Sequence, residues 1–136
     1  MITRRKFLAA TAVALSSLAA GNVLAAPPTV EIIAMPHPPV KMALGELRAW
    51  LAAQGNKLRV NEFDSESTEG MQRIQAVGLS GHIPILILID GQYRFPRKEG
   101  GKVALINFPN LPNTPPGARG DWTTADVQAI LAERIR

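Results

Sequence analysis

A run of apolar residues in the second half of the chain constrains the fold more than any other feature. Residues 83–89 read Ile-Pro-Ile-Leu-Ile-Leu-Ile, and Asp90 and Gly91 follow directly. A strand that is apolar on both faces needs a covering layer on each side. The run therefore predicts a sheet with helices packed on both faces. The Asp90-Gly91 pair predicts a tight turn at the end of the strand.

Before that run, two strand patterns flank a helix pattern. Residues 30–34 form a short β-type run, and residues 58–63 alternate apolar and polar side chains, which predicts a strand with one solvent-exposed face. Between these two strands, a helix is predicted that begins at Pro39 and ends at Gly55-Asn56. Proline suits the first turn of a helix, because a backbone N–H in that turn has no helical partner. Its buried stripe at helical spacing is Val40, Leu44, Leu47, Trp50 and Leu51.

The other predicted elements are a short helix, a returning strand and a terminal helix. The short helix covers about residues 67–77, and its inward-facing side chains are Met71, Ile74 and Gln75. Residues 102–107 are the candidate returning strand, and the proline-rich residues 108–120 predict an irregular loop. Thr123 and Asp126 stand at capping-box spacing before a stripe of Val127, Ile130 and Leu131. The order strand, helix, strand, helix, strand, strand, helix predicts a mixed α/β sandwich.

The first residues of the chain predict export. Arg4 and Arg5 precede an apolar run that is too short and too rich in small residues to span a membrane stably. The paired arginines resemble the twin-arginine export motif. The small residues that follow the apolar run favour cleavage by a signal peptidase after Ala25. We therefore expect a cleaved twin-arginine signal peptide over residues 1–25. Residues 26–136 would then form one domain, periplasmic or secreted and not membrane-spanning in its mature form.

Removing this leader changes the charge balance of the protein. The full chain has 15 Lys and Arg against 11 Asp and Glu, and three of the cations lie in the leader. The mature chain would carry 12 cations and 11 anions, a net charge of about +1. Nucleic-acid binding needs a concentrated basic surface, so the composition argues against a nucleic-acid partner. The chain also has no cysteine, which excludes disulfides and thiol chemistry.

The pattern resembles the thioredoxin-like fold over nearly all of residues 26–136. The residues that carry the resemblance are the first strand leading into the turn of residues 35–41, and the apolar strand that begins Gly81-His82-Ile83-Pro84. The resemblance implies a βαβ–αββα three-layer sandwich with a central mixed sheet. It also implies that Pro84 follows a cis peptide bond and that the backbone of Ile83 faces a binding groove.

The chain departs from the redox members of that fold at the site of their chemistry. Where they carry Cys-x-x-Cys, residues 35–39 read Met-Pro-His-Pro-Pro. Dithiol oxidoreductase activity is excluded because the nucleophile must be a thiolate. The fold and its groove remain as the basis of function, and we expect a binding protein.

The histidines predict a metal site in that groove. The chain has only two, His37 and His82, and the thioredoxin-like arrangement brings both to one end of the sheet. Imidazole is a common ligand for zinc and copper, and the thioethers of Met35 and Met42 would add a preference for Cu(I). The alternative is that both histidines are ordinary loop residues and both methionines fill the core.

Two further interpretations remain open. The groove formed by the turn of residues 35–39 and the loop of residues 82–84 would bind a periplasmic protein or peptide by strand addition, through His37, Pro38, His82, Ile83 and Pro84. Alternatively, His37 or His82 would act as a general base in an enzyme, although no catalytic nucleophile stands out. The acidic residues Asp64, Glu66 and Glu69 suit a cation site, but such residues are also common at a solvated helix start.

Overall fold

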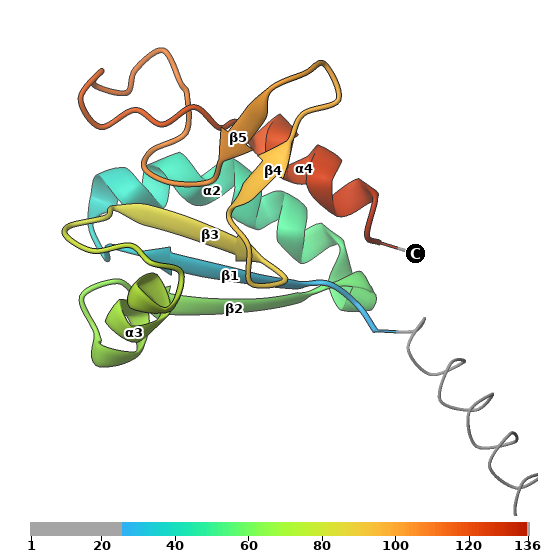
Figure 1. Cartoon of the computed structure of the whole chain (residues 1–136), viewed down its shortest axis with the longest axis horizontal. Coiled ribbons are helices and arrows are strands. Elements are labelled where there is room, and N and C mark those ends of the chain that lie inside the picture. Colours follow the sequence, from blue (N-terminus) through green and yellow to red (C-terminus); the bar gives the residue numbers. More distant parts are fainter. Residues whose placement is uncertain (1–25, 136) are drawn as a thin grey trace, which may run out of the picture.

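The computed structural model describes residues 26–135, which Figure 1 shows as a ribbon. The elements are β1 (Thr29–Ala34), α2 (Pro38–Ala53), the 3-10 helix η1 (Gly55–Lys57), β2 (Arg59–Asp64), α3 (Thr68–Ala76), β3 (Ile85–Ile89), β4 (Arg94–Pro96), β5 (Lys102–Ala104) and α4 (Thr124–Ala132). The predicted mixed α/β fold is confirmed. The predicted leader, residues 1–25, lies outside the described residues.

Three strands form the main sheet in the order β2-β1-β3. β1 pairs in parallel with β2, with Val30 opposite Val60, and antiparallel with β3, with Ile32 opposite Ile87. Parallel strands need a long crossover, which α2 and η1 supply. The sheet is therefore mixed, with β1 in its centre and β2 at one edge.

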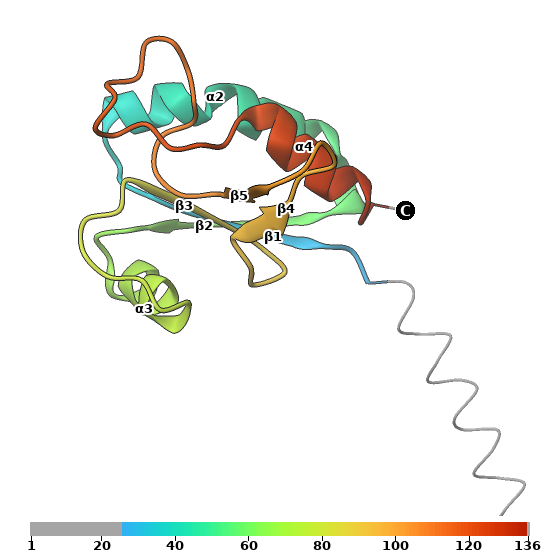
Figure 2. The same ribbon diagram turned by 45° about the horizontal axis from the view of Figure 1, so that its top comes forward.

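β3 is buried along its whole length because its side chains enter two separate cores. Ile85, Ile87 and Ile89 pack in one cluster with residues of α2 and α4, whereas Leu86 and Leu88 pack with Ile33, Ile74 and Ile83 on the opposite face. Figure 1 and Figure 2 show α2 and α4 on one side of the sheet and α3 on the other. The predicted helical layers on both faces are confirmed.

The Asp90-Gly91 turn is also confirmed. Both residues have positive φ angles, 50° and 82°, as a two-residue type I′ turn requires. The returning strand predicted at residues 102–107 is divided. Residues Lys102–Ala104 pair with β4 in a separate hairpin, and the chain then reaches β3, where Ile106 lies opposite Leu86. A strand of three residues is too short to show an alternating hydrophobic pattern, so the sequence could not predict that this strand leaves the main sheet.

Two details of the predicted burial are wrong. β2 was expected to have one solvent-exposed face, but five of its six residues are exposed and Phe63 is half-buried, because β2 lies at the edge of the sheet. In α3, Ile74 is buried as predicted, whereas Met71 is 48% exposed and Gln75 is exposed. The residues of α3 that face the sheet are Gly70 and Ile74, one helical turn apart.

The last helix begins as predicted. The Thr123 hydroxyl accepts a hydrogen bond from the Asp126 N–H at 3.1 Å, and the Asp126 carboxylate accepts one from the Thr123 N–H at 2.9 Å. Trp122 is fully buried beside this cap, and its indole N–H donates to the Asn107 carbonyl at 2.9 Å. Within residues 26–135, no helix is long and apolar enough to cross a membrane.

Candidate functional site

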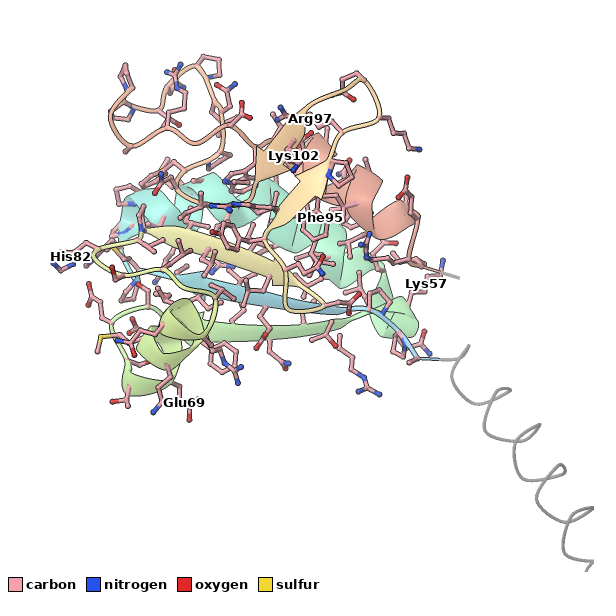
Figure 3. The ribbon with its side chains drawn as sticks, in the orientation of Figure 1. Lys57, Glu69, His82, Phe95, Arg97 and Lys102 are labelled. Carbon is pink, nitrogen blue, oxygen red and sulfur yellow. The ribbon has the colours of Figure 1, made fainter. Side chains whose placement is uncertain are left out.

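Three loops meet at the end of the sheet where β1 and β2 finish and β3 begins. The parallel pairing of β1 and β2 brings the turn after β1 next to the loop after β2, and the Ser65 N–H donates to the Ala34 carbonyl at 2.9 Å. The antiparallel β3 brings its preceding loop to the same end, where the Met35 N–H donates to the Pro84 carbonyl at 2.9 Å. Figure 3 shows His82 on this loop.

The loops enclose a partly open cavity of about 410 Å³, which we call the His82 cavity. Its lining comes from the turn after β1, the β2–α3 loop, α3 and the loop before β3: Met35, Ser65, Glu66, Met71, Gly81, His82 and Ile83. Apolar side chains supply much of this lining. The polar groups are one carboxylate, one imidazole and one hydroxyl.

The β2–α3 loop is held in place by its own hydrogen bonds. The Glu66 N–H donates to the Asp64 carboxylate at 2.8 Å, and the Ser67 hydroxyl caps α3 by accepting from the Gly70 N–H at 3.1 Å. The Ser67 hydroxyl also donates to the Asp64 carbonyl at 2.6 Å. At Gly70 the helix lies so close to this loop that a Cβ atom would overlap the Asp64 carbonyl oxygen. These contacts position Glu66 and Met71 at the cavity.

His37 is linked to the cavity through Glu66. It occupies the N-cap position of α2, but its side chain makes no capping hydrogen bond, and Pro38 and Pro39 follow at the first helical positions. Its Nε2 atom lies 3.2 Å from Glu66 Oε1. The two side chains are 55% and 52% exposed, so this contact adds little to stability. It does tie the turn after β1 to the β2–α3 loop.

The structure brings most of the predicted site residues together. Met35, His82 and Ile83 line one cavity, Pro84 is joined to Met35 through the backbone, and His37 contacts a lining residue. The turn and the loop that the sequence analysis paired are therefore neighbours. The arrangement follows from strand order, because all three loops lie at the same end of the sheet.

Met42 and Pro38 do not line the cavity. Met42 is 83% exposed on α2, two residues after the buried Val40. Two residues correspond to about 200° around a helix, which places the two side chains on opposite sides. Pro38 is exposed at the first position of α2. The predicted ligand set of His37, His82, Met35 and Met42 therefore loses Met42.

The peptide bond before Pro84 is trans, because none of the peptide bonds in residues 26–135 is cis. The cis isomer that the resemblance implied is wrong for this structure. The trans isomer of an X–Pro bond is more stable by about 0.5–1 kcal/mol. The Pro84 carbonyl still reaches the Met35 N–H in this form.

Three lining side chains were missed from the predicted site. Glu66 was predicted to belong to a separate acidic cluster, either a cation site or a solvated helix start, Met71 was predicted to face the core, and Ser65 was not considered. Ser65 is 7% exposed, and its buried hydroxyl oxygen has no hydrogen-bond partner among residues 26–135. Knowledge of the strand order would have found all three, because the loop after β2 and the first turn of α3 must lie beside the turn after β1.

Two kinds of side-chain arrangement are absent around the cavity within residues 26–135. In the described part of the chain, neither imidazole hydrogen-bonds a hydroxyl group that would serve as a nucleophile. No three His, Cys, Asp or Glu side chains of this part lie close enough to hold a metal ion.

A cluster of ion pairs away from the cavity joins the β4–β5 hairpin to the start of α4. Arg97, which is labelled in Figure 3, donates to the Asp126 carboxylate at 3.0 and 3.2 Å and to the Asp121 carboxylate at 3.1 Å. Partial burial raises the pKa of Asp126, but hydrogen bonds from Arg97 and from the Thr123 backbone outweigh it and hold that pKa below its usual value. Because these contacts complete a helix cap, we assign this cluster a structural role.

No protein-family model matches this chain, and no curated protein or solved structure gives a significant match to it.

Proposed function

We propose that this chain is an exported binding protein with a thioredoxin-like fold and no thiol chemistry. Support for the fold comes from the strand order β2-β1-β3, with one parallel and one antiparallel pair, and from helices α2 and α3 on opposite faces. The missing cysteines support a function by binding. The pattern of residues 1–25 supports export.

The ligand we propose is an extended segment of a partner protein, bound in the His82 cavity. One observation carries this proposal. Ile83 lines the cavity, and within residues 26–135 neither its backbone N–H nor its C=O has a hydrogen-bond partner. Ile83 is 7% exposed, and the backbone groups of buried residues are almost always paired, so these groups favour a ligand that can pair with them. An extended segment does so by strand addition and places apolar side chains against Met35 and Met71.

Site-specific cross-linking tests this proposal. A photo-reactive residue replaces Met71 in the cavity, and a matched variant carries it at Met42, which is equally a methionine but lies outside. Both are irradiated in periplasmic extract. We expect a discrete adduct only from position 71, and excess unlabelled wild-type protein should remove it whereas excess Met71→Arg protein should not. Equal labelling from both positions would contradict the proposal.

A transition metal, copper or zinc, is a second candidate ligand of the same cavity. The observation that favours it is that Met35 and His82, predicted as ligands from the sequence, both line the cavity. Calorimetric titration with Cu(I), Cu(II) and Zn(II) tests it, together with His37→Ala and His82→Ala. Binding weaker than about 0.1 mM, or an affinity that neither substitution changes, would exclude the metal.

A further inference from the structure

We propose, on the basis that the His82 cavity is the ligand site, that it binds Cu(I) through the thioethers of Met35 and Met71 and the imidazole of His82. The three residues come from different elements: the turn after β1, helix α3 and the loop before β3. All three line the His82 cavity, and Met35 also packs against the core on the α2 side of the sheet. The proposal does not depend on a partner protein.

The distribution of sulfur supports a soft-metal site. The chain has no cysteine and four methionines, of which Met35, Met42 and Met71 belong to the described residues. Two of these three line one cavity, although they lie on separate elements. Thioethers bind Cu(I) and add little to sites for harder ions. The cavity therefore concentrates the only type of soft ligand that this protein has.

Met71 is available for binding because the core does not use it. The buried residues of α3 are Gly70 and Ile74, whereas Met71 is 48% exposed. Because Met71 is exposed and also lines the cavity, its thioether is accessible to a ligand there. A metal ligand must be accessible and held in position. The Met71 thioether is accessible, and Ser67 caps the N-terminus of the helix that carries it.

His82 is the available imidazole of the two. The Nε2 atom of His37 already contacts Glu66, whereas no hydrogen bond of the His82 side chain is found within residues 26–135. Gly81 has a φ angle of +90°, a backbone conformation that favours glycine and turns the chain just before His82. Figure 3 shows His82 at the end of the sheet where the loops meet.

The ligand set selects both the metal and its oxidation state. Two thioethers and one imidazole are neutral, so a bound Cu(I) keeps its single positive charge. Zinc sites take thiolate, imidazole and carboxylate ligands, and no three such groups converge in the described part of the chain. Glu66 lines the same cavity, and its negative charge offsets that of the ion without serving as a ligand.

Competition with the coloured Cu(I) chelator bicinchoninate tests the proposal under anaerobic, reducing conditions. The full chain is used without added histidine tags. We expect one Cu(I) per chain, bound more tightly than Zn(II). Met71→Leu and His82→Gln should each weaken Cu(I) binding by more than the roughly tenfold loss typical of an outer-shell partner. The matched control Met42→Leu should stay within about twofold of wild type.

X-ray absorption of the Cu(I) complex provides a readout of the ligands themselves. Two sulfur scatterers and one nitrogen scatterer are expected for wild type, and one sulfur fewer for Met71→Leu. Met71 and His82 are exposed, so both variants should keep the wild-type circular dichroism spectrum. Met35→Leu is the third ligand variant, but Met35 is half-buried, so this substitution is the one that could disturb the fold. In that case Met71→Leu and His82→Gln still test the proposed Cu(I) site.

Several results would overturn the proposal. They are no Cu(I) binding by the wild type, an equal loss of affinity in Met42→Leu and Met71→Leu, or a spectrum with only nitrogen and oxygen scatterers. Failure of Cu(I) binding leaves the cross-linking result at position 71 unaffected. The copper site and the partner site can therefore fail independently.

Discussion

Gly70→Ala is the substitution that best tests how α3 is positioned against the cavity. In an exposed helix, replacing Gly with Ala stabilises a protein by about 0.5–1 kcal/mol, because glycine has more conformational freedom to lose on folding. At Gly70, however, the new Cβ would overlap the Asp64 carbonyl oxygen and lie 3.0 Å from the Ser65 Cα. These are backbone atoms of a hydrogen-bonded loop, so they cannot move aside cheaply. Overpacking of this kind costs about 1–3 kcal/mol.

Subtracting the propensity gain from this overpacking cost leaves an expected net destabilisation between about 0 and about 2.5 kcal/mol. Gly45→Ala is the matched control, because Gly45 lies inside α2 with nothing within 4 Å of its added Cβ. That variant should be more stable than wild type by about 0.5–1 kcal/mol. Urea denaturation followed by circular dichroism measures the free energy of unfolding of both. A Gly70→Ala protein as stable as Gly45→Ala would refute the close approach of α3 to the loop.

Three further expectations concern stability and export. Thr123→Ala removes the N-cap of α4 and should lower the free energy of unfolding by about 0.5–2 kcal/mol in urea titrations; an unchanged midpoint would contradict the capping box. The pKa of Asp126 is lowered in the folded state, so its stabilising contribution is present above its unfolded pKa of about 3.9 and is lost as the pH falls below that value. The acid-induced loss of stability should therefore be smaller in Asp126→Asn, measured by urea titration between pH 6 and pH 3, and an identical loss would exclude this cause. Replacing Arg4 and Arg5 by Lys should leave the protein in the cytoplasmic fraction on cell fractionation, whereas continued export would rule out the twin-arginine route.

Much of the fold was predictable because hydrophobic periodicity reports which faces are covered. The apolar run of residues 83–89 predicted two helical layers, and the structure has them. The Asp90-Gly91 turn and the Thr123–Asp126 cap were predictable because their chemistry is local. The β4–β5 hairpin was not, because three-residue strands carry too few side chains to show a period.

The candidate site was predictable only in part. His82 and Ile83 stood out because a breaker and a proline frame them before the buried strand. Met71 was assigned to the wrong side of α3, because apolar character alone predicts burial. The fold instead places Gly70 against the loop, where only glycine fits. Met42 lies outside the cavity because its position on α2 points away from the buried stripe.

By itself, the sequence determined the class of fold, the absence of thiol chemistry and the local turns and caps. Each of these follows from residue type and short-range spacing. Only the tertiary structure decided which side chains share the His82 cavity. Met35, Glu66, Met71 and His82 are distant along the chain, and they meet because β1 pairs in parallel with β2 and antiparallel with β3. Strand order is a property of long-range packing, which no short stretch of residues encodes.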